Sequence, residues 1–324
     1  MTRGDDAGET LATDGGYEVS TWEPRTALDR LAVLVYAGLV WSARWGVVAL
    51  AVLAFTAQLG LVVYGITVRP TLGVLTVASI LPALVIVGAI WRQDPTARQP
   101  AWPLAATFLL SVLFASFAAV ANAALKSVVA GYVPSALALV AFFFLVVGPV
   151  EETVKWLAVL LYAYDTTGFD AVVDGAVYGA VAGLGFATIE NALYISRAII
   201  DAGGFQAARS LQGAFEVATS RSFVGPGHVL YSSIAGYYLG LAKFTDDHWG
   251  PIVVKGLLLA AGIHAAYNSI VTVVDFGAFP AVSGGVGFVA FVFAFEGAVG
   301  YLLYRKLSKY ERYYRAGATR ANDG

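Results

Sequence analysis

Long apolar stretches recur along almost the whole chain, and they restrict its fold more than any other feature of the sequence. About 20 consecutive apolar residues are needed for a helix to cross the hydrocarbon core of a bilayer. Applied from the N-terminus, this length predicts eight transmembrane helices, at residues 45–68, 71–91, 103–125, 135–164, 171–199, 223–243, 252–274 and 283–304. We therefore expect an all-α, polytopic membrane protein.

The composition agrees with this fold class and argues against several others. Of the 324 residues, 58% are hydrophobic and 13% are charged, and the mean hydropathy is +0.71. Average soluble domains carry about 25% charged residues. The net charge of -2 argues against a nucleic-acid partner, and the absence of cysteine excludes disulfides and thiolate-bound metals.

We predict three parts along the chain. Residues 1–28 are acidic, rich in Gly and Thr and without a signal-peptide pattern, and are expected to form a disordered tail. Residues 29–307 form the multi-span membrane domain, and residues 308–324 form a basic C-terminal tail. Leu31–Trp41 is apolar but short, which predicts an interfacial helix, with a ninth span as the alternative. The distribution of Lys and Arg between the connections predicts that both termini are cytoplasmic.

Three charged side chains, Glu151, Glu152 and Lys155, lie inside an otherwise apolar stretch. A charge at bilayer depth costs roughly 2.5–3.5 kcal/mol on insertion scales, so these residues indicate a functional site. Gly148-Pro149 precedes them, and the proline predicts a kink or break in the helix. The four-residue spacing of Glu151 and Lys155 predicts an ion pair that leaves Glu152 free to face a cavity. A salt bridge at a helix end is the simpler alternative.

Phe186, Glu190 and Asn191 form a second group on the next predicted helix. Three glycines at four-residue spacing, from Gly175 to Gly183, form a ridge on which another helix can pack closely. Glu190 lies seven residues after the ridge and close to the same face, so the packed backbone should come near its carboxylate. The alternative is that the glycines serve packing alone and Glu190 is a buried structural acid.

Two histidines lie on later predicted helices, each on a stripe of small residues. His228 is followed four residues later by Ser232, and His264 is followed four residues later by Asn268. A single intramembrane histidine often serves only to form an interhelical hydrogen bond. Two histidines on separate helices, each on a stripe of small residues, predict a functional site. Glu296 lies in the last predicted span without a local partner and predicts an interhelical hydrogen bond.

The predicted depths of these polar groups overlap. Glu151 and His264 fall near mid-membrane, and Glu190 and His228 fall between the middle and the outer face. We therefore expect one site between four central helices, in a pocket that opens outward.

In combination, these residues resemble the PrsW family of intramembrane proteases. That family belongs to the superfamily of type II CAAX prenyl endopeptidases and CPBP proteins. The matching residues are Glu151, Glu152 and Lys155 for the acidic motif, Phe186, Glu190 and Asn191 for the second motif, and His228, His264 and Asn268 for the histidine motifs. The resemblance covers a motif core of about residues 100–275, and the H-E-x-x-H motif of soluble metalloproteases is absent.

The resemblance implies an endopeptidase that hydrolyses a peptide bond in a membrane-associated protein. Glu151 or Glu152 would accept a proton from water as the general base, and His228 would share that water. His264 and Asn268 would donate to the developing oxyanion. Helix geometry pairs Glu151 with Lys155 and so favours Glu152 as the base, whereas the superfamily favours the first glutamate. We expect Glu151 to be the base.

The supporting residues in this mechanism are Lys155, Phe186, Glu190, Asn191 and Ser232. A zinc ion held by His228, His264 and either Glu190 or Glu151 is compatible with the same residues, and so is a metal-free mechanism.

The resemblance also bears on partners and location. It suggests the prokaryotic plasma membrane and a single-span substrate such as an anti-sigma factor, or alternatively a prenylated or peptide precursor. Two non-proteolytic functions are compatible with buried carboxylates. One is a non-catalytic scaffold of the same superfamily, which has no need of both glutamates. The other is a cation- or proton-coupled transporter, although the two halves of the chain show no internal repeat.

Overall fold

The computed structural model describes residues 24–322, apart from 97–98, 134, 206–209 and 276–284. All regular elements in the described residues are helices, which confirms the predicted all-α fold class. The chain divides into two units, residues 1–52 and 53–324. The helix α2 (Ala27–Val68) begins in the first unit and ends in the second.

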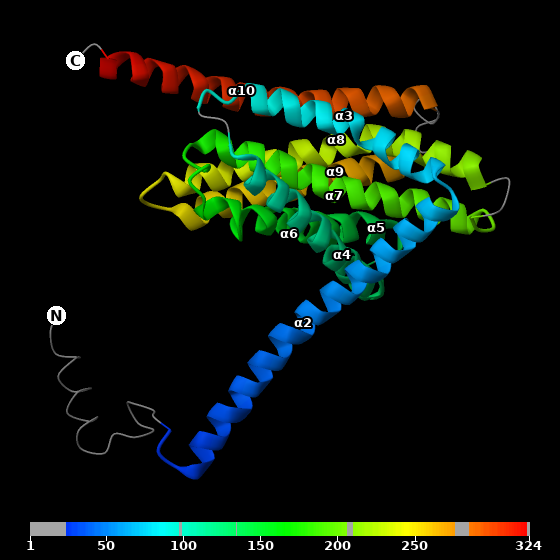
Figure 1. Cartoon of the computed structure of the whole chain (residues 1–324), viewed down its shortest axis with the longest axis horizontal. Coiled ribbons are helices and arrows are strands. Elements are labelled where there is room, and N and C mark those ends of the chain that lie inside the picture. Colours follow the sequence, from blue (N-terminus) through cyan, green and yellow to red (C-terminus); the bar gives the residue numbers. More distant parts are fainter. Residues whose placement is uncertain (1–23, 97–98, 134, 206–209, 276–284, 323–324) are drawn as a thin grey trace. The chain divides into compact units, whose positions relative to one another are not determined.

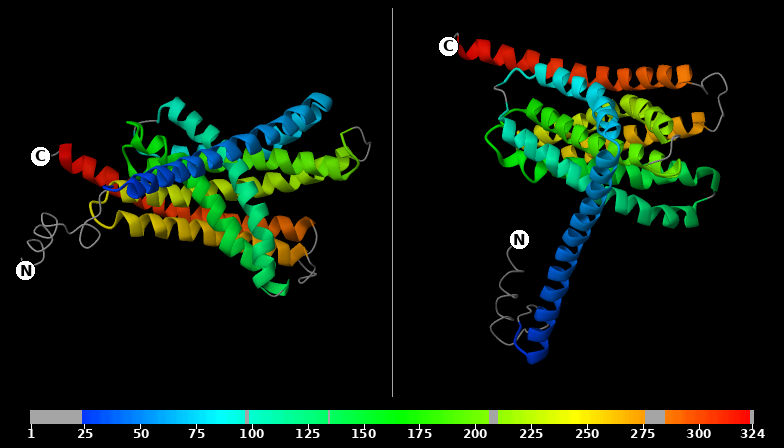
Figure 2. Two further views of the ribbon diagram at one scale, coloured as in Figure 1. Left: turned by 90° about the horizontal axis from the view of Figure 1, so that it is seen from below. Right: turned by 45° about the vertical axis from the view of Figure 1, so that its right-hand side comes forward.

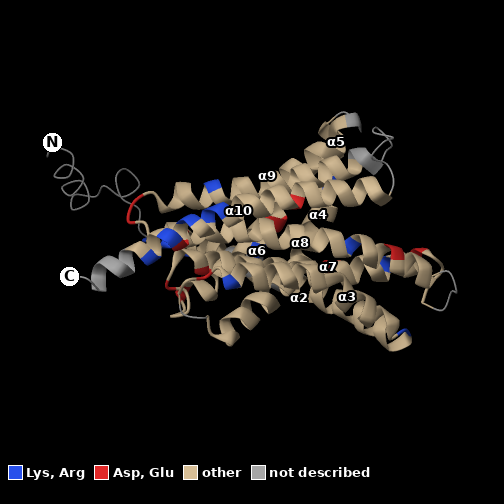
Figure 3. Ribbon diagram, turned by 90° about the horizontal axis from the view of Figure 1, so that it is seen from above, with Lys and Arg blue, Asp and Glu red and all other residues tan. Residues whose placement is uncertain are grey.

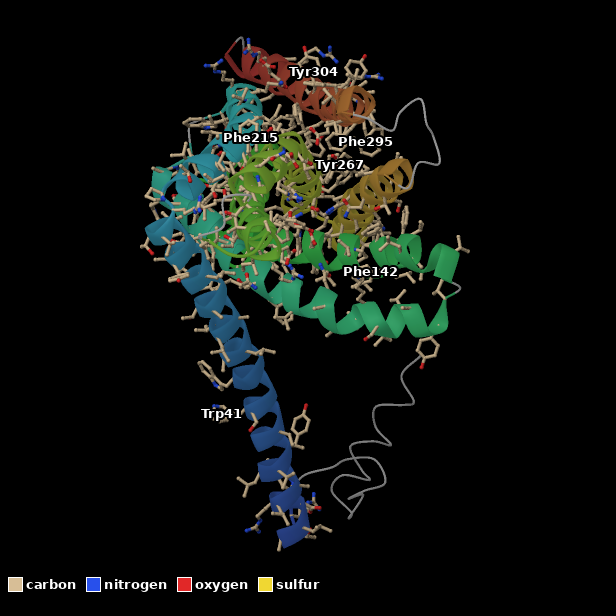
Figure 4. The ribbon with its side chains drawn as sticks, turned by 90° about the vertical axis from the view of Figure 1, so that its right-hand side faces the viewer. Trp41, Phe142, Phe215, Tyr267, Phe295 and Tyr304 are labelled. Atoms are coloured by element: carbon tan, nitrogen blue, oxygen red, sulfur yellow. The ribbon has the colours of Figure 1, made fainter. Side chains whose placement is uncertain are left out.

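In the first unit, the described structure is the N-terminal part of α2. A reciprocal pair of hydrogen bonds starts this helix, because the Thr26 N–H donates to Asp29 Oδ2 (2.7 Å) and the Asp29 N–H donates to Thr26 Oγ1 (3.1 Å). Leu31–Trp41 is helical, as predicted, but it is not a short helix of its own, because α2 continues through it into the following apolar stretch. Trp41 is exposed and projects from the ribbon in Figure 4. Most of the predicted N-terminal tail lies outside the described residues.

The second unit consists of the end of α2 and a bundle of further helices (Figures 1 and 2). Their bounds are α3 (Thr71–Arg92), α4 (Ala101–Tyr132), α5 (Ser135–Phe142), α6 (Gly148–Leu160), α7 (Val172–Asp201), α8 (Ser210–Lys243), α9 (Trp249–Asp275) and α10 (Gly285–Asn322). Because α10 continues to Asn322, the predicted C-terminal tail from residue 308 is helical as far as that residue.

In the part of the chain that the structure describes, each of the eight predicted spans lies mainly on helix. Among the described residues, six segments are long and apolar enough to cross a membrane: Thr71–Arg92, Ala101–Tyr132, Leu137–Asp165, Val172–Asp201, Trp249–Thr272 and Gly285–Ala316. Val52–Val68 in α2 is apolar but shorter, and α8 does not meet the same criterion. The α8 helix packs against α3, α7 and α9, and the small and polar side chains from Gly225 to Gly236 are buried there. Figure 3 shows most charged residues toward the helix ends.

The glycine ridge of α7 packs directly against the backbone of α8, as predicted. A methyl group added at Gly175, Gly179 or Gly183 would lie 2.1, 2.3 or 2.4 Å from a carbonyl oxygen of α8. The carbonyl nearest Gly183 is that of His228. The ridge therefore fixes the position of His228 relative to α7.

The helix that carries the acidic motif is distorted but not broken. A π-helical turn at Phe143–Val147 joins α5 to α6, immediately before Gly148-Pro149. Such turns occur frequently at functional sites. A methyl group at Gly148 would lie 2.5 Å from the Ala261 carbonyl oxygen, so this glycine lets α9 approach α6 closely. That approach brings His264, about one turn after Ala261, to the acidic motif.

Candidate active site

Glu152 lies on the inner side of α6 and is completely buried. Its Oε1 accepts from Lys155 Nζ at 2.7 Å and lies 2.8 Å from His264 Nδ1, while Ser232 Oγ donates to Oε2 at 3.2 Å. These partners come from α6, α8 and α9. Both carboxylate oxygens of Glu152 are thus bonded to protein, and no face of the group is left for a cavity.

Glu151 is also buried, but it turns toward the neighbouring helix α4. Its Oε1 accepts from Asn122 Nδ2 at 3.0 Å. Its Oε2 makes no hydrogen bond to any described residue and lies 3.8 Å from His264 Nε2 and 3.9 Å from Lys155 Nζ. The predicted ion pair between Glu151 and Lys155 is therefore present at 3.9 Å, but the prediction that Glu152 is left free is wrong, because Glu152 pairs with the same lysine at 2.7 Å. Lys155 lies closer to Glu152, because residues three apart also share a helix face and α8 and α9 enclose that face.

His228 is held between two charged groups. Lys155 Nζ donates to its Nδ1 at 3.0 Å, and its Nε2 lies 2.9 Å from Glu190 Oε2. Arg221 also forms an ion pair with Glu190 and donates from Nε to Asn191 Oδ1 at 2.8 Å. Two side chains of α8 thus reach the Glu190 carboxylate, and Asn191 supports Arg221 at the end of this network.

Aromatic rings pack around the two histidines. The Phe186 ring centroid lies 4.2 Å from Lys155 Nζ and 5.4 Å from the ring centroid of His228. The ring centroids of His228 and His264 are 5.2 Å apart, and Tyr231 packs on His264 at 5.5 Å. These contacts restrict the ring orientations and place the polar groups in an apolar surrounding.

Two cavities adjoin Glu151. The polar cavity, about 410 Å³, is bordered by Glu151, His228, His264 and Asn268. The α4–α7 cavity, about 460 Å³, lies between those two helices. The structure thus brings together the predicted residues Glu151, Glu190, His228, His264 and Asn268 around one cavity. It places Glu152 and Ser232 behind them.

Both cavities extend in the same direction along the bundle. Lys126 and Thr272 border the polar cavity and Arg197 borders the α4–α7 cavity, and all three lie near the C-terminal ends of their helices. In the predicted topology this is the outer end of the bundle.

Three residues offer ligand atoms for a metal ion. Glu151, His228 and His264 each present one such atom, and these atoms lie within 4.8 Å of one another. One carboxylate and two imidazoles form a ligand set typical of catalytic zinc sites. Glu151 Oε2 is free of hydrogen bonds, and the contact between Glu152 and His264 Nδ1 leaves Nε2 for a ligand. Both ring nitrogens of His228 have partners, so His228 could bind a metal only after one nitrogen loses its contact with Lys155 or Glu190.

Sequence reasoning missed two residues of this site. Asn122 is a polar residue inside the apolar stretch 103–125, a signal that could have identified it. Arg221 precedes the predicted span 223–243 and therefore falls in a predicted connection, whereas α8 begins at Ser210. Glu296 is buried beside Gly227 of α8, but its Oε1 makes no hydrogen bond to any described residue, so the expected interhelical hydrogen bond stays a prediction.

Tyr267 and Phe295, labelled in Figure 4, form part of the contact between α9 and α10. Their ring centroids are 5.5 Å apart. This aromatic packing secures α10 beside the helix that carries His264.

Comparison with known proteins gives consistent matches. The model of a family described as "PrsW family intramembrane metalloprotease" matches residues 99–298. Protease PrsW of Shouchella clausii is 26% identical over 199 residues, which cover 61% of this chain and 83% of the relative. Protease PrsW of Geobacillus kaustophilus is 30% identical over 198 residues, covering 59% and 76%. Protease PrsW of Oceanobacillus iheyensis is 30% identical over 194 residues, covering 60% and 80%. No solved structure matches the chain.

Proposed function

The chain belongs to the PrsW family of intramembrane metalloproteases and is a multi-pass membrane protease, and we propose that it hydrolyses a peptide bond with a water held at Glu151. The observation that carries this proposal is the free Oε2 of Glu151, buried 3.8 Å from His264 Nε2. A water between these two atoms can hydrogen-bond to both. Family membership favours an enzyme over the scaffold and transporter alternatives.

Glu151 acts as the general base in this proposal. Asn122 holds Oε1, so that Oε2 faces the water and accepts its proton. The water oxygen then attacks the carbonyl carbon of the scissile peptide bond. As the C–N bond breaks, Glu151 returns the proton to the leaving nitrogen. Asn268, which borders the same cavity, is the side-chain donor for the oxyanion, where one preorganised donor contributes about 2.7–4 kcal/mol.

Glu152 is a positioning residue in this mechanism. Because it accepts from His264 Nδ1–H, the neutral imidazole keeps its lone pair on Nε2, which faces Glu151. Lys155 bonds to His228 of α8 and to Glu152, and Glu152 bonds to His264 of α9, so this pair links the two histidine-bearing helices to α6. His264 Nε2 therefore accepts a hydrogen bond from water or binds a metal. Because it carries no proton in this tautomer, Asn268 and not His264 donates to the oxyanion.

In the metal-dependent form of this proposal, zinc would be held by Glu151, His228 and His264, and Glu151 Oε2 would then be a ligand instead of the base. When bound, zinc would act as a Lewis acid that acidifies water and polarises the scissile carbonyl. Glu152 would orient His264 toward it. Glu190 would take part only indirectly, by releasing His228 Nε2 while remaining paired with Arg221.

We propose a single-span regulatory protein, of the kind represented by anti-sigma factors, as the substrate. In the proposed orientation both termini lie in the cytoplasm of a prokaryote, and the cavities open toward the outer face of the plasma membrane. The part of the substrate just outside its membrane span can reach Glu151 from the outer face.

The test is cleavage of a single-span protein by the purified chain in proteoliposomes, with the products identified by mass spectrometry. We expect two products whose masses sum to that of the substrate plus one water. Activity should be lost on chelation and restored by added zinc. The His264→Asn variant should be folded and inactive. Uncut substrate with the wild type, or unchanged cleavage by His264→Asn, would overturn the proposal, and full activity after chelation would remove the metal from it.

A further inference from the structure

The α4–α7 cavity meets the polar cavity at Glu151. Both cavities are bordered by Asn122, Glu151, Glu190 and Tyr194. The proposed base therefore lies at a junction, with the histidines on one side and the α4–α7 cavity on the other. A peptide bond placed at Glu151 would have its neighbouring side chain within reach of the second cavity.

The walls of the α4–α7 cavity are mainly apolar. The apolar residues are Ala115 and Ala119 of α4 and Phe186, Ile189 and Leu193 of α7. The two alanines are one helical turn apart, and their small side chains leave the space open. A closed apolar cavity of about 150 Å³ is enough to bind benzene in another protein. This cavity, of about 460 Å³, has room for a large apolar side chain.

Asn122 has an unused hydrogen-bonding atom at the junction. Its Nδ2 donates to Glu151, whereas its Oδ1 is buried and makes no hydrogen bond to any described residue. Buried amide oxygens are nearly always bonded, so this atom indicates a missing donor. An extended peptide supplies backbone N–H groups beside the bond to be cleaved.

We propose that the α4–α7 cavity binds the side chain of a large apolar substrate residue next to the scissile bond, while Asn122 Oδ1 accepts a backbone N–H of the same segment. This inference rests on the proposed function and specifies its substrate class: an extended peptide with leucine, isoleucine or phenylalanine at that position. Ala119 is the specificity-determining residue, because it borders the cavity and is itself exposed, so a larger side chain there fills the cavity without displacing the core.

The test uses Ala119→Phe and one single-span substrate with alanine, leucine or phenylalanine placed in turn at each residue flanking the cleaved bond. We expect the wild type to prefer leucine or phenylalanine at one of these positions by about 10-fold or more in kcat/KM. Ala119→Phe should lose that preference and still cleave the alanine substrate. Ala124→Phe, an exposed position elsewhere on α4, is the matched control and should behave as the wild type.

Two results would overturn the inference while leaving the proposed function intact. One is that Ala119→Phe lowers cleavage of all three substrates equally, and the other is that it changes none of them. If the wild type cleaves no substrate, including the alanine form, the proposed function fails and this inference fails with it.

Discussion

On the inner side of α6 both oxygens of Glu152 have hydrogen-bond partners, whereas on the cavity side Glu151 keeps one oxygen free. The two residues are adjacent in sequence and identical in chemistry. The difference arises because α8 and α9 enclose one face of α6, while α4 contributes a single amide to the other. Glu152, on the fully bonded side, fixes the positions of the histidine-bearing helices. Glu151, on the partly bonded side, has an oxygen available to react.

Removing Lys155 should break the fully bonded side and have the largest effect. Lys155→Met leaves Glu152 as a buried charge without its cation, and such a loss typically costs 3–5 kcal/mol. We expect a large fall in the thermal unfolding midpoint in detergent, together with loss of cleavage. The double variant Lys155→Met with Glu152→Leu should recover stability but not activity. Wild-type stability in the single variant would show that the network does not fix the fold.

Filling the glycine ridge should have the next largest effect. A Gly183 methyl group would already lie 2.4 Å from the His228 carbonyl oxygen, and a backbone atom cannot move aside as a side chain can. We expect Gly183→Leu to destabilise the protein by about 1–3 kcal/mol or more and to reduce cleavage by displacing His228. The control is Gly262→Leu, where an added methyl meets no atom within 4 Å. Equal unfolding midpoints for the two variants would contradict the role of the ridge.

Weakening the support of His228 should have a smaller effect, mainly on rate. Arg221→Gln removes the ion pair to Glu190, whose side chain is only 20% exposed. We expect kcat to fall about 10-fold, as for other residues that orient catalytic groups, with KM nearly unchanged. Arg315→Gln breaks a pair with Glu311 near the C-terminal end of α10, where the arginine side chain is 72% exposed, and should change neither value. If both variants have the same kcat, Arg221 does not act through Glu190.

The fold was largely predictable because each apolar stretch carries its own length signal. In the described residues the eight predicted spans lie mainly on helices, but the start of α2 was misplaced. There the sequence shows a short apolar stretch between arginines, and hydropathy alone does not reveal that the helix continues through it. The start of α8 was also missed, because residues 210–222 are too polar for a span, although they continue the same helix.

The site could be predicted as a set of residues but not as a bonding pattern. Four motifs on four apolar stretches were enough to bring Glu151, Glu190, His228 and His264 together. The spacing of Glu151, Glu152 and Lys155 permits either glutamate to pair with the lysine. Which glutamate lies closer to the lysine depends on where α8 and α9 pack. Tertiary contacts such as the approach of α9 at Gly148 determine that packing.

The division of labour between the two glutamates is tested most directly by comparing Glu151→Gln with Glu152→Gln in one preparation, measuring both the unfolding midpoint and the cleavage rate. In Glu151→Gln the amide oxygen can still accept from Asn122, so the midpoint should stay unchanged while the rate falls about 100- to 10,000-fold. In Glu152→Gln the midpoint should fall, because the charge opposite Lys155 is lost. Wild-type cleavage by Glu151→Gln would contradict the account.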